Sequence, residues 1–138
     1  MVGEHPRKVV TQEAMSVATA TWNTWRGWDL SREPNLTGAD LPRADLARAD
    51  LARADLSEAD LSEANLSGTN LTEADLSGAI LTEADLSGVD LAEAILVGAI
   101  LSGADLSTAS LTQEELESAT VDENTRLPPD LNPPRTGE

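Results

Sequence analysis

Carboxylates are the most abundant side chains able to do chemistry in this chain of 138 residues. There are 25 Asp and Glu against nine Lys and Arg, which gives a formal net charge of −16. Paired carboxylates can serve as general acid and base in glycoside hydrolysis, provided that a cleft holds them and raises one pKa. Ser is frequent too, but the single histidine, His5, lies in a polar N-terminal stretch. It has no fixed position from which to act as a general base.

The residues that are missing exclude further chemistry. The chain has no Cys, so disulfides, thiolate zinc sites and Cys nucleophiles are excluded. The glycines at 68, 78, 88, 98 and 103 are evenly spaced and form no phosphate-binding loop. A pI near 4.1 argues against direct binding to nucleic acid or anionic lipid. No apolar run approaches the length of a membrane span or a signal peptide, so the sequence predicts a cytoplasmic protein.

An internal repeat governs the fold. Leu recurs every five residues from Leu36 to Leu111, in 16 consecutive pentads. The residue two before Leu is Ala in 13 pentads, and the residue directly before Leu is Asp or Asn in 12. Residues five apart on an α-helix are separated by about 140° of rotation, so these leucines would form no apolar stripe. An odd spacing also alternates between the two faces of a straight strand.

Within one pentad, however, Ala and Leu lie two residues apart and share a face. Each pentad therefore predicts a short extended piece followed by a bend, and a chain that bends after every pentad coils into a solenoid. Ala and Leu should point inward and the other three residues outward, with each coil burying its apolar side chains on its neighbours. A narrow rod filled with Leu offers no cleft. We therefore expect no enzyme activity, no cofactor and no metal site.

The sequence ADLSEADLSEANLSGTNLTEADLSG, residues 54–78, resembles the A(D/N)LXX motif of the pentapeptide repeat family. The resemblance covers about residues 34–113. It implies an all-β fold, a right-handed quadrilateral β-helix (a β-solenoid) with four pentads per coil. Sixteen pentads then give about four coils.

The open ends of a solenoid need caps. Val10, Ala14, Val17, Ala18, Trp22 and Trp25 fall at spacings of three and four, which predicts an N-terminal α-helix whose tryptophans cover the first coil. Thr112 and Glu115 form a capping-box pattern that predicts a short helix over about 113–119, with Leu116 and Ala119 inward. The expected organisation is an N-terminal tail and capping helix at 1–33, the β-helix at 34–113, and a cap helix with a Pro-rich tail at 114–138.

With four pentads per coil, residues 20 apart stack. Arg43 then lies over Glu63, and Arg53 over Glu73, as exposed pairs of small energetic value. The residues before Leu stack into acidic ladders, which include Asp60, Asp75, Asp85, Asp90 and Asp105. One interpretation is that Asp and Asn bond the nearby backbone of the turn. Another is an anionic surface that mimics DNA, because the family includes gyrase-binding, quinolone-protecting members. A calcium site is the third, although the Gly-Gly-x-Gly-x-Asp pattern is absent.

Four β-branched apolar residues depart from the outward pattern: Ile80, Ile95, Val97 and Ile100. Ile80 and Ile100 are expected to stack, with Ile95 and Val97 on the adjoining face. One interpretation is that the C-terminal segment folds back over them through Val121 and Leu127. The other is a contact surface for a partner protein or a second copy of the chain.

These observations favour a non-enzymatic scaffold that binds an unidentified protein, or itself, through the four apolar residues. The alternative is a DNA mimic that binds DNA gyrase through the acidic ladders. A purely structural module is the third hypothesis. None of them includes direct binding to nucleic acid or to a membrane.

Overall fold

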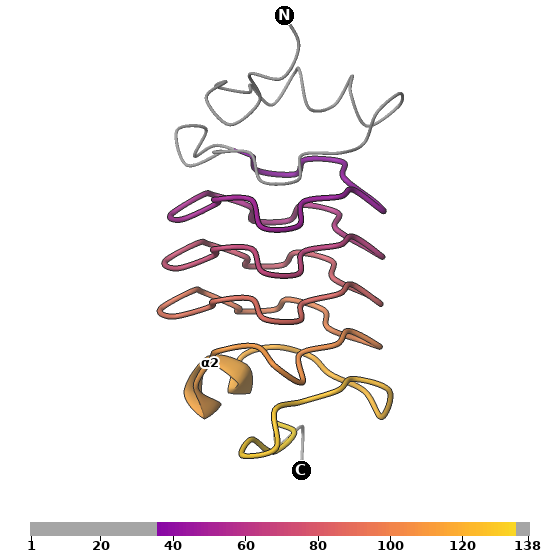
Figure 1. The fold of residues 1–138 in the computed structure, drawn as a ribbon, viewed down its shortest axis with the longest axis vertical. Coiled ribbons are helices and arrows are strands. Elements are labelled where there is room, and N and C mark those ends of the chain that lie inside the picture. Colours follow the sequence, from indigo (N-terminus) through magenta and orange to yellow (C-terminus); the bar gives the residue numbers. More distant parts are fainter. Residues whose placement is uncertain (1–35, 135–138) are drawn as a thin grey trace, which may run out of the picture.

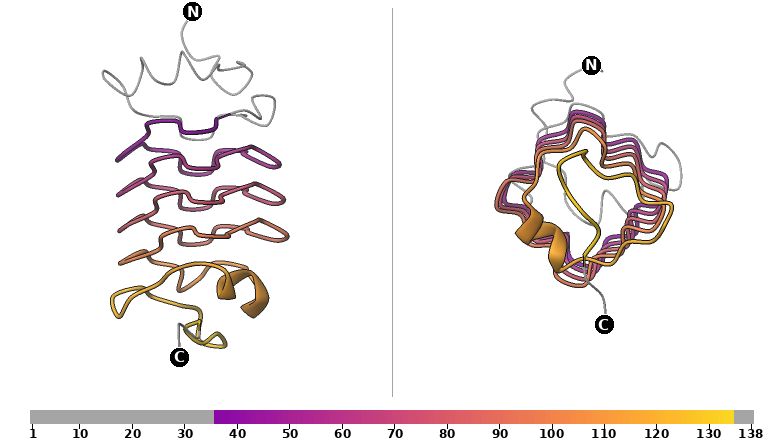
Figure 2. Two further views of the ribbon diagram at one scale, coloured as in Figure 1. Left: turned by 180° about the vertical axis from the view of Figure 1, so that it is seen from behind. Right: turned by 90° about the horizontal axis from the view of Figure 1, so that it is seen from below.

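The computed structural model describes residues 36–134, which form a rod of stacked coils (Figure 1). Parallel bridges join residues 20 apart, as in Asp40 with Asp60, Asp60 with Ile80, and Ile80 with Ile100. Seen from one end, the coils superimpose in a four-sided outline (Figure 2). The predicted solenoid with four pentads per turn is therefore present over these residues. The predicted N-terminal capping helix, with Trp22 and Trp25, lies outside them.

The backbone of each coil is hydrogen-bonded to the coils on either side. The N–H of Asp60 donates to the carbonyl of Ala39 at 2.9 Å, and the carbonyl of Asp60 accepts from Leu41 at 2.8 Å. Further bonds of this kind, such as Gly78 N–H to the carbonyl of Val97 at 2.9 Å, run through the bends. Stacking is thus set by the main chain, with a period of 20 residues.

Each pentad contains one tight turn. The carbonyl of Leu76, for example, accepts from the N–H of Ala79 at 3.0 Å. The third residue of the turn has a positive φ, 67° at Gly78 and 62° at Glu73, as a type II turn requires. This left-handed position was not predicted from the sequence. The sequence did carry a signal for it, because Gly, which favours a positive φ, occupies this position in several pentads, and Glu or Arg occupies it in most of the others.

The core is the predicted double row of Leu and Ala, and every pentad Leu from Leu36 to Leu106 is buried. Thr69 occupies one Ala position, is also buried, and donates its Oγ1 hydrogen to the carbonyl of Leu46 at 2.8 Å. The prediction that the residue after Leu points outward is wrong for Ala47 and Ala52, which are 1% and 9% exposed. Ala92, at the same pentad position, is exposed, so pentad position alone does not set burial.

The C-terminal end closes with helix α2, Gln113–Glu117. Thr112 is its N-cap, and the predicted capping box with Glu115 is present. The helix ends two residues before the predicted 119, because the chain returns to the ladder. The carbonyl of Ser118 accepts from Gly98 at 2.9 Å. Leu116 and Ala119 are buried as predicted.

Side chains satisfy the hydrogen-bond donors that the last coil leaves free. The N–H of Gly88 donates to Oγ1 of Thr108 at 2.9 Å, that of Glu93 to Oε2 of Glu115 at 2.7 Å, and that of Gly103 to Oδ1 of Asp122 at 3.1 Å. In earlier coils the corresponding acceptor is a carbonyl oxygen. Polar side chains therefore close much of this edge of the solenoid.

Candidate interaction surfaces

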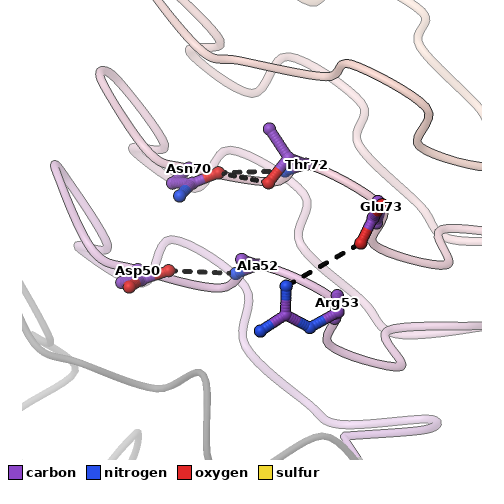
Figure 3. A network of polar contacts seen from close by, with 6 residues as sticks. All are labelled: Asp50, Ala52, Arg53, Asn70, Thr72 and Glu73. Atoms are coloured by element: carbon purple, nitrogen blue, oxygen red, sulfur yellow. Dashed lines mark hydrogen bonds and ion pairs between the residues drawn. The ribbon is translucent and has the colours of Figure 1, made fainter.

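Most of the Asp and Asn residues that precede a pentad Leu make a local hydrogen bond. The Oδ1 atom of each accepts from the N–H two residues on, at 3.0 Å from Thr72 to Asn70 and 3.2 Å from Ala52 to Asp50 (Figure 3). Where that residue is Ser or Thr, its hydroxyl donates to the same oxygen, as from Ser77 to Asp75 at 2.6 Å. Ten residues make the backbone bond: Asp45, Asp50, Asp55, Asp60, Asn65, Asn70, Asp75, Asp85, Asp90 and Asp105. The structural interpretation of these residues is therefore correct.

These bonds also tune two of the carboxylates. The hydroxyl of Ser107, followed by its N–H and the charge of Arg126, lowers the pKa of Asp105 below the usual value, against partial burial that raises it. The hydroxyl and N–H of Ser57 similarly lower the pKa of Asp55. Neither carboxyl has the raised pKa that a general acid needs at neutral pH.

The predicted acidic ladders do not gather on one face. The bridges define four columns of residues 20 apart, which begin at Asp40, Asp45, Asp50 and Asp55. Asp60, Asp75 and Asp90 lie in three of these columns, and Asp85 pairs with Asp105 in the fourth. Asp–Asp bridges occur at 40–60, 55–75 and 85–105, whereas Asn65 and Asn70 separate the charges elsewhere. The negative charge is thus distributed around the rod.

The predicted cation–anion stacks are present as ion pairs. Arg43 and Glu63 approach to 3.8 Å, and so do Arg53 and Glu73 (Figure 3). All four side chains are more than half exposed. Pairs of this kind contribute about 0–1 kcal/mol each.

Ile80, Ile95, Val97 and Ile100, here called the apolar patch, are exposed. Their exposed fractions are 37%, 46%, 59% and 37%. Ile80 and Ile100 form a parallel bridge, as predicted from their spacing. The interpretation that the C-terminal segment covers the patch is wrong, because Val121 and Leu127 pack against the buried core instead.

In the apolar patch, Ile and Val stand at positions where other pentads have the hydrogen-bonding side chains described above. At 55 and 57, and again at 75 and 77, an Asp–Ser pair bonds side chain to side chain at 2.6 Å. Ile95 and Val97 occupy the same two positions one coil on. Ile95 and Val97 therefore stand where the two earlier coils have a hydrogen-bonded Asp–Ser pair. Neither of their side chains can accept a hydrogen bond.

Other kinds of site were sought in the described part of the chain. Within residues 36–134, no three side chains of His, Cys, Asp or Glu lie close enough together to hold a metal ion. No helix in this part is both long and apolar enough to cross a membrane.

Comparison with solved structures gives two pentapeptide repeat proteins and one fluoroquinolone resistance protein. A pentapeptide repeat protein from the cyanobacterium Nostoc is 34% identical, over 91% of this chain and 93% of its own, with a TM-score of 0.49. One from the thylakoid lumen of Arabidopsis thaliana is 31% identical over 67% of this chain, with a TM-score of 0.50. QnrB1, a plasmid-mediated fluoroquinolone resistance protein, shares the fold at a TM-score of 0.67 and 23% identity over 80% of this chain.

This chain spans only 60% of the Arabidopsis protein and 57% of the QnrB1 chain. No curated protein sequence matches it. The model of pentapeptide repeats matches residues 35–68, 59–96 and 69–107, in eight copies. Together with the 20-residue coils and the Leu core, this match identifies the protein as a member of the pentapeptide repeat family, with the right-handed β-helix that the likeness to QnrB1 implies.

Proposed function

We propose that the protein is a non-enzymatic scaffold that binds another protein, or a second copy of itself, through the apolar patch. The observation that supports this function is that three patch residues lack the side-chain oxygen that accepts the local backbone hydrogen bond in other pentads. Ten Asp and Asn residues before Leu make that bond, and Ile80, Ile95 and Ile100 forgo it. A hydrogen bond of this kind contributes about 1 kcal/mol.

The packing of the coils does not compensate for this loss at every position. Ile80 and Ile100 stack on each other, and a cross-strand pair of this kind contributes about 0.2–1 kcal/mol. Ile95 instead stacks on Asp75 and gains no apolar neighbour from that coil. With an exposed fraction of 46%, Ile95 contributes little to the core. A contact outside the solenoid explains it better than the fold does.

The double variant Ile95→Asn with Ile100→Asn tests the proposal. Asn already occupies this position at 65 and 70, where it makes the local bond, so the variant should fold. It also leaves the charge unchanged. We expect wild type to self-associate or to retain a protein from a bacterial lysate, as measured by light scattering and by capture on the immobilised chain. The variant should lose that association, whereas Asp50→Asn with Asp85→Asn should keep it. Identical behaviour of all three proteins would contradict the proposal.

The second candidate is a DNA mimic that binds DNA gyrase through acidic residues. Three Asp–Asp bridges and the absence of Lys and Arg between Arg53 and Arg126 favour it. The fluoroquinolone resistance of QnrB1 gives the reason to consider it, although that protein is longer. A gyrase supercoiling assay at low and moderate salt tests it. Inhibition that fades with salt is expected of a mimic, and absence of inhibition at micromolar protein contradicts this candidate.

We propose in addition that the repeat body spans residues 34–113, between two terminal caps. The N-terminal cap, at 1–33, would use Trp22 and Trp25 to cover the first coil. The C-terminal cap, from 114 onward, would comprise α2 and the Pro-rich segment. Val121, Leu127 and Leu131, which pack against the core, support the second assignment.

A further inference from the structure

We infer that the partner presents apolar side chains flanked by Lys or Arg, and is not a second copy of this chain. The inference rests on the proposed function and specifies the chemistry of the partner. The observation behind it is the charge around the apolar patch. A surface that fits this patch must match its rim as well as its apolar centre.

Acidic residues border the patch on several sides. Asp60 forms a bridge with Ile80, and Asp75 forms one with Ile95. Both aspartates thus lie one coil before the patch residue with which their backbone pairs. Each is half-buried and held by its Ser, at 2.7 Å from Ser62 and 2.6 Å from Ser77. These charges are fixed in place before any partner arrives.

Three glutamates complete the rim: Glu83, Glu93 and Glu117, and all three are exposed. Glu93 lies two residues before Ile95, and its backbone N–H bonds the α2 side chain of Glu115. Glu117, at the end of α2, precedes Ser118, whose carbonyl accepts from Gly98 next to Val97. Glu83 follows Ile80 by three residues and lies against Gly103, three residues after Ile100.

The cations of residues 36–134 lie outside the two columns of bridged residues that contain Ile80, Ile95 and Ile100. Arg43, Arg48 and Arg53 belong to the coil that lies 40 residues before the coil of Glu83 and Glu93. Arg43 and Arg53 also pair with Glu63 and Glu73. Arg126 forms a bridge with Asp105, in a column that the patch does not enter. Within residues 36–134, the only charged residues bridged to the patch are therefore Asp60 and Asp75.

This arrangement disfavours a symmetric dimer. In a twofold contact the same surface meets itself, so the five rim carboxylates of one copy would face those of the other. Like charges brought together across an interface oppose association. Lys or Arg beside apolar side chains would instead contact the rim while the apolar groups cover the patch.

Binding of designed peptides to the full chain tests the inference. The probes are three short fluorescent peptides: alternating Leu–Lys, alternating Leu–Glu and alternating Ala–Lys. We expect only the Leu–Lys peptide to bind well, with an affinity that falls as salt rises. Ile95→Asn with Ile100→Asn should weaken it about tenfold or more. Asp60→Asn with Asp75→Asn should also weaken it, since it removes two rim charges and keeps the local hydrogen bonds.

The matched control is Asp50→Asn with Asp85→Asn, which removes two charges from columns that the patch does not occupy. It should weaken binding less than the rim variant does. Equal weakening would show general charge attraction and overturn the inference. Binding of the Leu–Glu peptide, or dimers of the wild type that Ile95→Asn with Ile100→Asn abolishes, would also overturn it while leaving the scaffold function intact. If no peptide binds and the patch variant changes nothing in capture or oligomeric state, both proposals fail.

Discussion

At the scale of the residue, the Asp that precedes Leu in most pentads is first a structural residue. Its carboxylate accepts the N–H, and often the hydroxyl, of the residue two positions on, and so holds the chain as it enters the turn. Asp105 shows the full set, with Ser107 donating from its N–H at 3.0 Å and from its hydroxyl at 2.7 Å. An acidic surface is therefore partly a consequence of how the repeat turns.

Asp105→Ala should destabilise the protein by about 1 kcal/mol at neutral pH, because it removes the acceptor for Ser107. Asp105→Asn should cost less, since an amide oxygen accepts the same bonds at Asn65 and Asn70. Urea unfolding of the three proteins measures the difference. Equal losses in both variants would show that charge, and not the hydrogen bond, supplies the stability.

The same variants predict a pH dependence. Because folding lowers the pKa of Asp105 below its usual 3.8, the ionised group adds stability above that pH, and this share is lost as pH falls through the folded pKa. Asn does not titrate. The advantage of wild type over Asp105→Asn should therefore shrink below about pH 4.

Much at this scale was predictable, because the Asp–Leu–Ser spacing is that of a side chain bonding its own turn. The left-handed backbone was not. Glu and Arg are good helix formers, and nothing in their own propensity indicates the positive φ of 62° at Glu73 or 64° at Arg53. The tertiary ladder imposes that conformation at a cost of about 1–2 kcal/mol per residue. Gly at equivalent positions was the available signal.

At the scale of the element, α2 does more than bury its own Leu116 in the core. Glu115 uses both carboxylate oxygens: Oε1 accepts from the N–H of Thr112 at 2.9 Å, and Oε2 accepts from the N–H of Glu93 at 2.7 Å. One side chain therefore caps the helix and closes the edge of the preceding coil. The capping box was readable from four consecutive residues, 112–115. The contact with Glu93 was not, since it joins residues 22 apart.

Glu115→Ala should destabilise the protein by about 1–2 kcal/mol, since two N–H groups lose their acceptor. Glu115→Gln should fall between wild type and Ala, because its single oxygen can serve only one of the two donors. Hydrogen exchange of the Glu93 backbone N–H separates the contact with the preceding coil from the capping of α2. This exchange should be faster in the Ala variant than in wild type.

Glu114→Ala is the matched control, since it removes a carboxylate from the same first turn of α2. It should leave exchange at Glu93 unchanged. If it matches Glu115→Ala in both measurements, then the negative charge near the start of α2 is responsible, and the two hydrogen bonds are not.

At the scale of the whole molecule, charge is divided unevenly along the chain. Residues 1–53 carry seven acidic and seven basic side chains, whereas residues 54–138 carry 18 acidic side chains and two Arg. The period of 20 then brings some of those acids together. The five-residue period predicted the solenoid. Only the family resemblance predicted four pentads per coil, because the number of sides depends on the angle through which each turn rotates the chain, and the period does not give that angle.

Two opposing electrostatic effects follow from this arrangement, and their sizes can be compared. Carboxylates stacked about 5 Å apart repel by about 0.8 kcal/mol per pair in water, and three Asp–Asp bridges are present. The two exposed ion pairs of Arg43 and Arg53 contribute about 0–1 kcal/mol each. Repulsion should therefore exceed attraction, and the net charge of −16 adds to it.

The prediction is that salt stabilises this protein. Between about 20 and about 200 mM NaCl the Debye length falls from about 20 to about 7 Å, which screens the ladders, and the Tm measured by circular dichroism should rise. Asp60→Asn with Asp75→Asn breaks two of the three Asp–Asp stacks and keeps the local hydrogen bonds, so its Tm should respond less to salt. A Tm that falls as salt rises would mean that the ion pairs dominate. The stacked aspartates would then be held farther apart, or more fully screened, than the spacing of the coils implies.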